Sequence, residues 1–108
     1  MMQICCHDII FKGSTPTLSF ETNAPLDNYT EIYLTLEQCG IFILEKTKSD
    51  VKIVENNIEI ELTQEETMLL SHKYDIEAQL RIKYADGAAL TSEINTFNIG
   101  RVLKNGVI

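Results

Sequence analysis

Apolar and polar residues alternate along three stretches of the chain. Ile58, Ile60 and Leu62 alternate with glutamates, and 32–37 and 76–84 show the same two-residue period. Successive side chains of a strand point to opposite faces, so each stretch predicts a strand with one apolar and one wet face. A helix over 76–84 would scatter the aliphatic residues around its axis. The pattern therefore predicts antiparallel strands that are exposed on one side.

Residues that favour turns separate these stretches. They recur about every 8–12 residues, which is typical of many short strands. Asp86-Gly87 lies between the apolar runs 74–84 and 89–97 and predicts a tight hairpin there. Weaker patterns predict further strands at 2–11, 17–22, 41–46 and 51–54. The stretch 99–108 either continues the last strand or leaves the domain as an extended tail.

One segment breaks the alternation and predicts a short helix near 63–70. Thr63 and Glu66 have the spacing of a capping box, in which each side chain binds the other residue's backbone N–H. Acidic residues in this first turn also favour the positive end of the helix dipole. Two turns are marginal in isolation, so one of Met68, Leu69 and Leu70 should reach the core.

The order of the expected elements predicts the fold. Seven or eight short strands, a helix before a long strand and a terminal hairpin fit an all-β, immunoglobulin-like, two-sheet antiparallel sandwich over residues 1–108, which is the fold we expect. A small open barrel is the alternative. Tyr74, at the start of the long strand, is either the tyrosine that bonds back to the preceding connection in such sandwiches or an ordinary half-buried ring.

Composition agrees with a single β-rich domain. The 108 residues are 44% hydrophobic and include 14 Ile, 4 Val and 10 Thr but only 5 Ala, and branching at Cβ suits a pleated surface. The net charge of −7 would repel a polyanion, so we expect no nucleic-acid partner. The longest aliphatic or aromatic run, 41–44, is far short of the ~20 residues of a membrane helix. The first residues do not resemble a secretion signal, so we expect synthesis in the cytoplasm.

The cysteines and histidines are the most visible candidates for chemistry. Three cysteines (Cys5, Cys6 and Cys39) without a secretion signal favour reduced thiols that pack as small hydrophobic groups. A metal site is the alternative, in which Cys5 and His7 share an ion that Cys39 and His72 complete from elsewhere. A Cys–His nucleophile pair could also form from the same residues.

Other patterns also have structural explanations. Glu59 and Glu61 fall on the wet face of a strand, and Glu65 and Glu66 fit helix capping. Nucleotide-binding and hydrolase motifs are absent from the sequence. We therefore expect no enzyme, with no catalytic residue, metal, cofactor or small-molecule substrate.

Three stretches in the second half of the chain resemble a known family. They cover 58–67 with its L-T-x-E-E-T pattern, 74–87 with its D-G hairpin, and the V-L-containing end 99–108. Together they resemble small immunoglobulin-like proteins encoded in virion gene clusters of phages and prophages of Gram-positive bacteria. They are also similar to the N-terminal module of some baseplate upstream proteins. The family's usual K-G-D/S-T turn is matched by Lys12-Gly13-Ser14-Thr15.

This resemblance implies a structural role in the virion and no catalytic residues. The partners it implies are other virion structural proteins of tail or baseplate, or further copies of the same chain, reached after synthesis in the cytoplasm. Two other functions remain open from the residues. One is a metal- or thiol-dependent protein that uses Cys5, His7, Cys39 and His72. The other is a host module that binds an extended peptide by strand addition.

Overall fold

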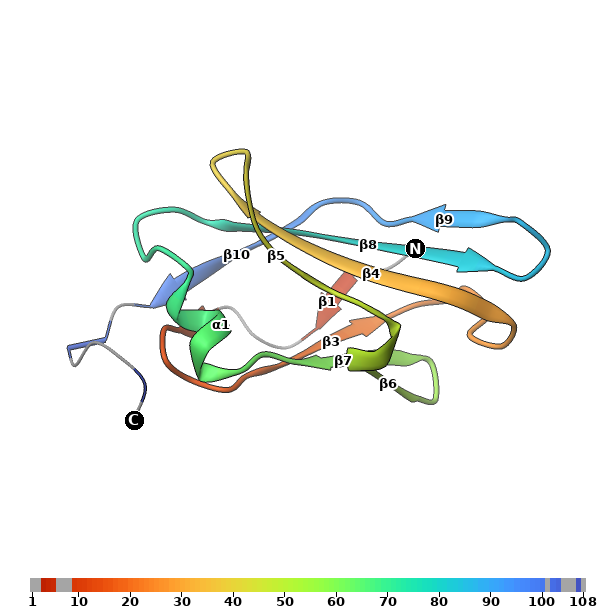
Figure 1. The fold of residues 1–108 in the computed structure, drawn as a ribbon, viewed down its shortest axis with the longest axis horizontal. Coiled ribbons are helices and arrows are strands. Elements are labelled where there is room, and N and C mark those ends of the chain that lie inside the picture. The colour runs from red at the N-terminus through yellow and green to blue at the C-terminus, as the bar shows by residue number, and fades with distance from the viewer. Residues whose placement is uncertain (1–2, 6–8, 101, 104–106, 108) are drawn as a thin grey trace.

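Two β-sheets face each other in the computed structural model, which describes residues 3–5, 9–100, 102–103 and 107 (Figure 1). The four-stranded sheet has the order β1 (Gln3–Cys5), β3 (Thr17–Glu21), β7 (Asn57–Glu61) and β6 (Val51–Val54). The six-stranded sheet has the order β2 (Ile9–Phe11), β10 (Asn95–Gly100), β8 (Ile76–Tyr84), β4 (Tyr29–Gln38) and β5 (Ile41–Lys46), and β9 (Ala89–Thr91) pairs with β8. The predicted all-β sandwich is confirmed.

The strand order is that of an immunoglobulin-like sandwich. In that fold, strands A, B, E and D form one sheet, and strands G, F and C form the other. Here β1, β3, β7 and β6 take the first set of places, and β10, β8 and β4 take the second. β5 extends the second sheet beyond β4, as the additional strand of variable-type domains does.

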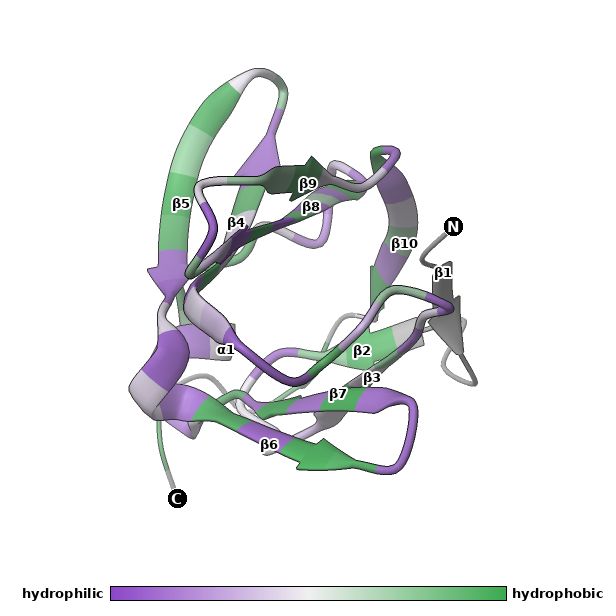
Figure 2. Ribbon diagram, turned by 90° about the vertical axis from the view of Figure 1, so that its right-hand side faces the viewer, coloured by the Kyte–Doolittle hydropathy of each residue, from purple (hydrophilic) through white to green (hydrophobic). Residues whose placement is uncertain are grey.

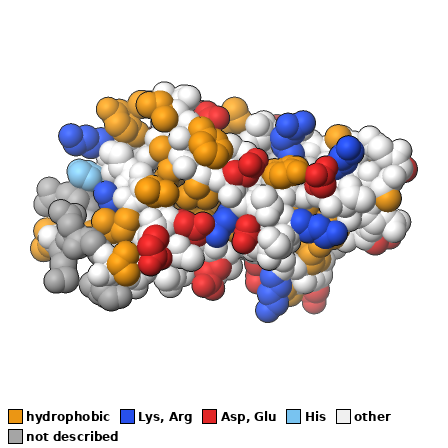
Figure 3. Space-filling model, in the orientation of Figure 1, with side chains coloured by type: hydrophobic (Ala, Val, Ile, Leu, Met, Phe, Trp, Pro, Cys, Tyr) orange, Lys and Arg blue, Asp and Glu red, His pale blue; other side chains and the backbone are white. Residues whose placement is uncertain are grey.

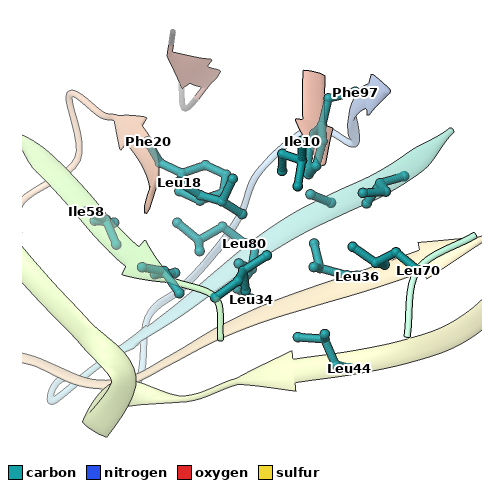
Figure 4. Close-up of a cluster of buried hydrophobic side chains, with 14 of the residues drawn as sticks. Ile10, Leu18, Phe20, Leu34, Leu36, Leu44, Ile58, Leu70, Leu80 and Phe97 are labelled. Atoms are coloured by element: carbon teal, nitrogen blue, oxygen red, sulfur yellow. The ribbon is translucent and has the colours of Figure 1, made fainter. Parts of the chain in front are cut away.

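The core lies between the inward faces of the two sheets (Figure 2). Leu34, Leu36 and Leu80 from the six-stranded sheet meet Leu18, Phe20 and Ile58 from the four-stranded sheet, and all six are fully buried (Figure 4). The burial alternates along β4 and β8 with a period of two. The hydrophobic alternation of the sequence thus becomes the inner face of each sheet.

The chain start corrects one prediction. A single strand was expected over 2–11, but β1 pairs with β3 in one sheet, and β2 pairs in parallel with β10 in the other. The chain therefore changes sheets within this segment, and the sandwich is not entirely antiparallel. Residues 6–8, between the two strands, lie outside the described residues.

The strand expected at 89–97 is also divided, into β9 and β10. Both parts pair with β8, but Ser92 interrupts them. Its Oγ accepts a hydrogen bond from the backbone N–H of Leu80 (2.9 Å) and donates one to the carbonyl of Glu93 (2.9 Å). The buried side chain of Ser92 thus replaces part of the backbone hydrogen bonding between the strands. The hydrophobic alternation of the sequence gives no sign of this. The two divided strands raise the count above the predicted seven or eight.

The two short helical segments lie in connections. The 3-10 helix η1 (Lys48–Asp50) joins β5 to β6, and α1 (Gln64–Met68) joins β7 to β8. The predicted capping box is present, with Glu66 N–H donating to Thr63 Oγ1 (3.2 Å) and Thr63 N–H donating to Glu66 Oε1 (2.8 Å). Among the expected anchors, Leu70 reaches the core, whereas Leu69 stays 60% exposed. Among the described residues, no helix is long and apolar enough to cross a membrane.

Tyr84, and not Tyr74, bonds back to an earlier connection. The hydroxyl of Tyr84 donates to the carbonyl of Pro25 (2.8 Å), between β3 and β4. Tyr74 is 49% exposed, and its hydroxyl has no hydrogen bond to the described residues. The predicted hairpin at Asp86-Gly87 is confirmed: Gly87 has a φ of 91° and its N–H donates to the carbonyl of Tyr84 (3.0 Å).

The final strand ends before the chain does. β10 reaches Gly100, and the described residues beyond it, 102–103 and 107, lie outside any strand. Leu103 is 92% exposed. The stretch 99–108 thus combines the two expected outcomes. Its beginning continues the strand, and its described remainder leaves the sheet. Residues 101, 104–106 and 108 lie outside the described residues.

Candidate interaction surface

The hairpin between β4 and β5 ends in a two-residue turn. Cys39 and Gly40 both have positive φ, at 52° and 73°. This combination matches the type I′ turn, whose twist suits the right-handed twist of paired strands. We call residues 38–42 the hairpin end. It projects beyond the sheets in both ribbon views (Figures 1 and 2).

Two large apolar side chains are exposed at the hairpin end. Ile41 is 64% exposed and Phe42 is 58% exposed. Ile41 lies opposite Gln38 in the register of β4 and β5, and Phe42 lies opposite Glu37, so the two side chains point to different faces of the hairpin. Figure 3 shows hydrophobic side chains gathered at the upper left, where Figure 1 places this hairpin.

Gln38 fastens the hairpin end to the connection between α1 and β8. Its side chain is buried, and Nε2 donates to the carbonyls of Ser71 (2.8 Å) and Tyr74 (2.9 Å). Its Oε1 accepts from the backbone N–H of Ser71 (2.8 Å). These three bonds use both N–H groups and the oxygen of the amide, and they hold the 71–74 loop against the end of β4. The exposed apolar residues therefore sit on a fixed support.

A free strand edge continues from the hairpin end. β5 is the edge strand of its sheet, and no described residue pairs with the side that faces away from β4. An unpaired edge presents backbone N–H and C=O groups to an extended partner. The hairpin end and this edge together form one surface with both apolar and hydrogen-bonding groups.

The other end of β5 is fixed to α1 by an ion pair. Lys46 Nζ lies 2.7 Å from Glu66 Oε1, and the two side chains are only 10% and 25% exposed. Burial raises the pKa of Glu66, but hydrogen bonds from Lys46 and from the backbone of Thr63 outweigh this and hold the pKa below its ordinary value. The pair thus links the six-stranded sheet to the connection that leaves the four-stranded sheet.

The structure brings two of the candidate chemical residues to the same end of the molecule. Cys39 directly follows Gln38, and His72 directly follows Ser71, to which Gln38 is bound. Both side chains are exposed, and no hydrogen bond joins them. No group of three or more metal-binding side chains occurs among the described residues.

The remaining candidates are dispersed. Cys5 belongs to β1, whereas Cys6 and His7 lie outside the described residues. Glu59 and Glu61 alternate along β7 on its outward side, as the wet-face interpretation predicts. Glu66 serves the helix cap and the ion pair with Lys46.

Sequence reasoning missed the two residues that support this surface. Gln38 continues the alternation of β4 at a core position, and a polar residue there is a signal of a buried hydrogen-bonding role. Lys46 continues the inward alternation of β5 in the same way. Their partners, however, lie far away in the sequence, and only the fold identifies them.

The fold defines the chain as an immunoglobulin-like β-sandwich. No protein-family model matches its sequence, and no curated protein matches it either.

Proposed function

We propose that this protein is a non-enzymatic structural component of a phage or prophage virion, in the tail or baseplate. It acts by binding neighbouring virion proteins or further copies of itself. The observation that carries the proposal is the hairpin end, where Ile41 and Phe42 are exposed on a support fixed by Gln38. The resemblance of 57–108 to virion proteins supports the setting.

The physical basis is the burial of apolar surface on assembly. Burying one such side chain contributes about 1.5–3 kcal/mol, and the fixed hairpin loses little conformational entropy on binding. The free edge of β5 adds backbone hydrogen bonds to a partner strand. Such a surface suits stable contacts between structural subunits.

Protein composition of purified particles tests the virion role. We expect mass spectrometry of particles released from the strain that encodes the chain to find it in a constant ratio to the other structural proteins. Deletion of its gene should prevent correct assembly. If the protein is missing from the particles and assembly survives the deletion, the proposal is wrong. Capture of one host protein through the β5 edge, without virion proteins, would instead support the host binding module.

Substitution of the hairpin end tests the surface. Ile41→Ser with Phe42→Ser should lower incorporation into particles by at least about tenfold, because two buried apolar side chains are lost from the contact. Val54→Ser with Ile94→Ser is the matched control, since both residues are exposed elsewhere (37% and 58%). Equal incorporation of the two double variants would exclude the hairpin end as the contact.

A further inference from the structure

A cavity of about 480 Å³, open to solvent on one side, lies at the end of the molecule opposite the hairpin end. It is formed between the 25–28 segment, which leads into β4, and the 85–88 turn, which follows β8. Pro25, Ala85 and Ala88 line it together with Tyr84. Its volume falls within the range of about 300–1,000 Å³ that is typical of ligand sites.

Hydrogen bonds hold the two walls of this cavity together. Tyr84 Oη donates to the carbonyl of Pro25 (2.8 Å), and Ala85 N–H donates to the carbonyl of Asn28 (2.9 Å). The turn itself is closed by the N–H of Tyr84, which donates to the carbonyl of Ala88 (2.9 Å). The cavity is therefore formed before any partner arrives.

Two carboxylates line the same cavity. Asp86 Oδ1 accepts from the backbone N–H of Ala88 (2.9 Å), and Asp27 makes no hydrogen bond to the described residues. Neither carboxylate forms an ion pair with a described residue. Burial, then the charges of Asp27 and Asp86, raise the pKa of the Tyr84 hydroxyl. The cavity thus presents two exposed carboxylates beside the ring of Tyr84.

We propose that this cavity binds a basic side chain of a partner polypeptide, with arginine as the best fit. A guanidinium can bond to carboxylates through several N–H donors and can also lie against an aromatic ring. Its aliphatic stem packs against apolar walls such as Pro25, Ala85 and Ala88. Lys48, whose Nζ lies 5.2 Å from the centre of the Tyr29 ring, does not line the cavity. The site is separate from the hairpin end, so it stands or falls independently of the proposed function.

Titration of the whole protein with a blocked tripeptide, acetyl-Gly-Arg-Gly-amide, tests the site by NMR. We expect amide shifts concentrated at Asn28, Ala85 and Ala88. The same tripeptide with citrulline in place of arginine should bind about tenfold more weakly, because it keeps the shape and loses the charge. Absence of shifts, or equal binding of both peptides, would overturn the proposal.

Two double variants that remove the same charge test whether Asp27 and Asp86 are the carboxylates that bind arginine. Asp27→Asn with Asp86→Asn should abolish the preference for arginine over citrulline, and the amide oxygen introduced by Asp86→Asn can still accept the bond that holds the turn. Glu59→Gln with Glu61→Gln removes the same charge from the other sheet and should leave the preference intact. An equal loss in both variants would show general attraction to an acidic protein and contradict the site. Asp27→Asn alone, which removes no hydrogen bond among the described residues, should show a partial loss without perturbing the turn.

Discussion

Buried polar side chains hold the connections of this sandwich in place. Gln38 binds the 71–74 loop, and Thr67 accepts from Gly13 N–H (3.0 Å) and donates to the carbonyl of Ser14 (2.9 Å). Among the described residues, no buried side-chain nitrogen or oxygen lacks a partner. Unsatisfied buried polar groups are costly, so each of these residues restricts the arrangement of the chain around it.

Replacement of Gln38 tests this restriction. Gln38→Leu should destabilise the protein by about 2–4 kcal/mol, because three backbone groups of Ser71 and Tyr74 lose their buried partner. Hydrogen exchange at the Ser71 amide should accelerate. Gln79→Leu is the control, since Gln79 makes one such bond, to the carbonyl of Ser92 (3.0 Å). Equal unfolding free energies for the two variants in urea would contradict the role of Gln38.

At the scale of elements, α1 is the connection best predicted from sequence. The Thr63 and Glu66 capping box was visible because both partners lie within one turn. The helix is shorter than the expected 63–70, since it ends at Met68 and the chain turns inward at Leu70. Lys46 and Gly13, which bind α1 from two other parts of the fold, could not be predicted from local spacing.

The ion pair between Lys46 and Glu66 makes stability depend on pH. Because the pKa of Glu66 in the folded state is lowered from its ordinary value, its contribution is complete above the unfolded pKa and is lost as the pH falls through the folded pKa. Glu66→Gln keeps a capping side chain but removes the charge. The wild type should therefore lose more unfolding free energy than Glu66→Gln between pH 7 and about pH 3. Glu65→Gln, in the same helical turn, should behave as the wild type in urea titrations at both pH values.

For the whole molecule, the sandwich places two different surfaces at opposite ends of β4. The hairpin end begins at Gln38, and Asn28, which lines the cavity, precedes the other end of β4, about 30 Å away along an extended strand. One end offers apolar side chains and a free edge, and the other offers carboxylates. The two surfaces could therefore contact two different partners at once.

Substitutions of two phenylalanines distinguish a residue that stabilises the fold from one that is available for binding. Phe20→Ala should cost about 3–5 kcal/mol, because Phe20 is fully buried between the sheets. Phe42→Ala should change the unfolding free energy by no more than about 0.5 kcal/mol, because Phe42 is 58% exposed. Thermal or urea unfolding measures both. A large cost at Phe42 would mean that this residue stabilises the fold instead of remaining available to a partner.

The sequence by itself determined the strands from β3 to β8, the capped start of α1 and the inward faces, because these depend on neighbours within a few residues. The alternation of β4, β7 and β8 and the turn at Asp86-Gly87 are such local features. Only the tertiary structure decided that the first expected strand is divided between the sheets, that Gln38 binds Ser71, and that Asp27 and Asp86 line one cavity. These features depend on contacts between residues more than 30 positions apart in the chain or on a change of sheet. Hydrophobic periodicity carries no information about either.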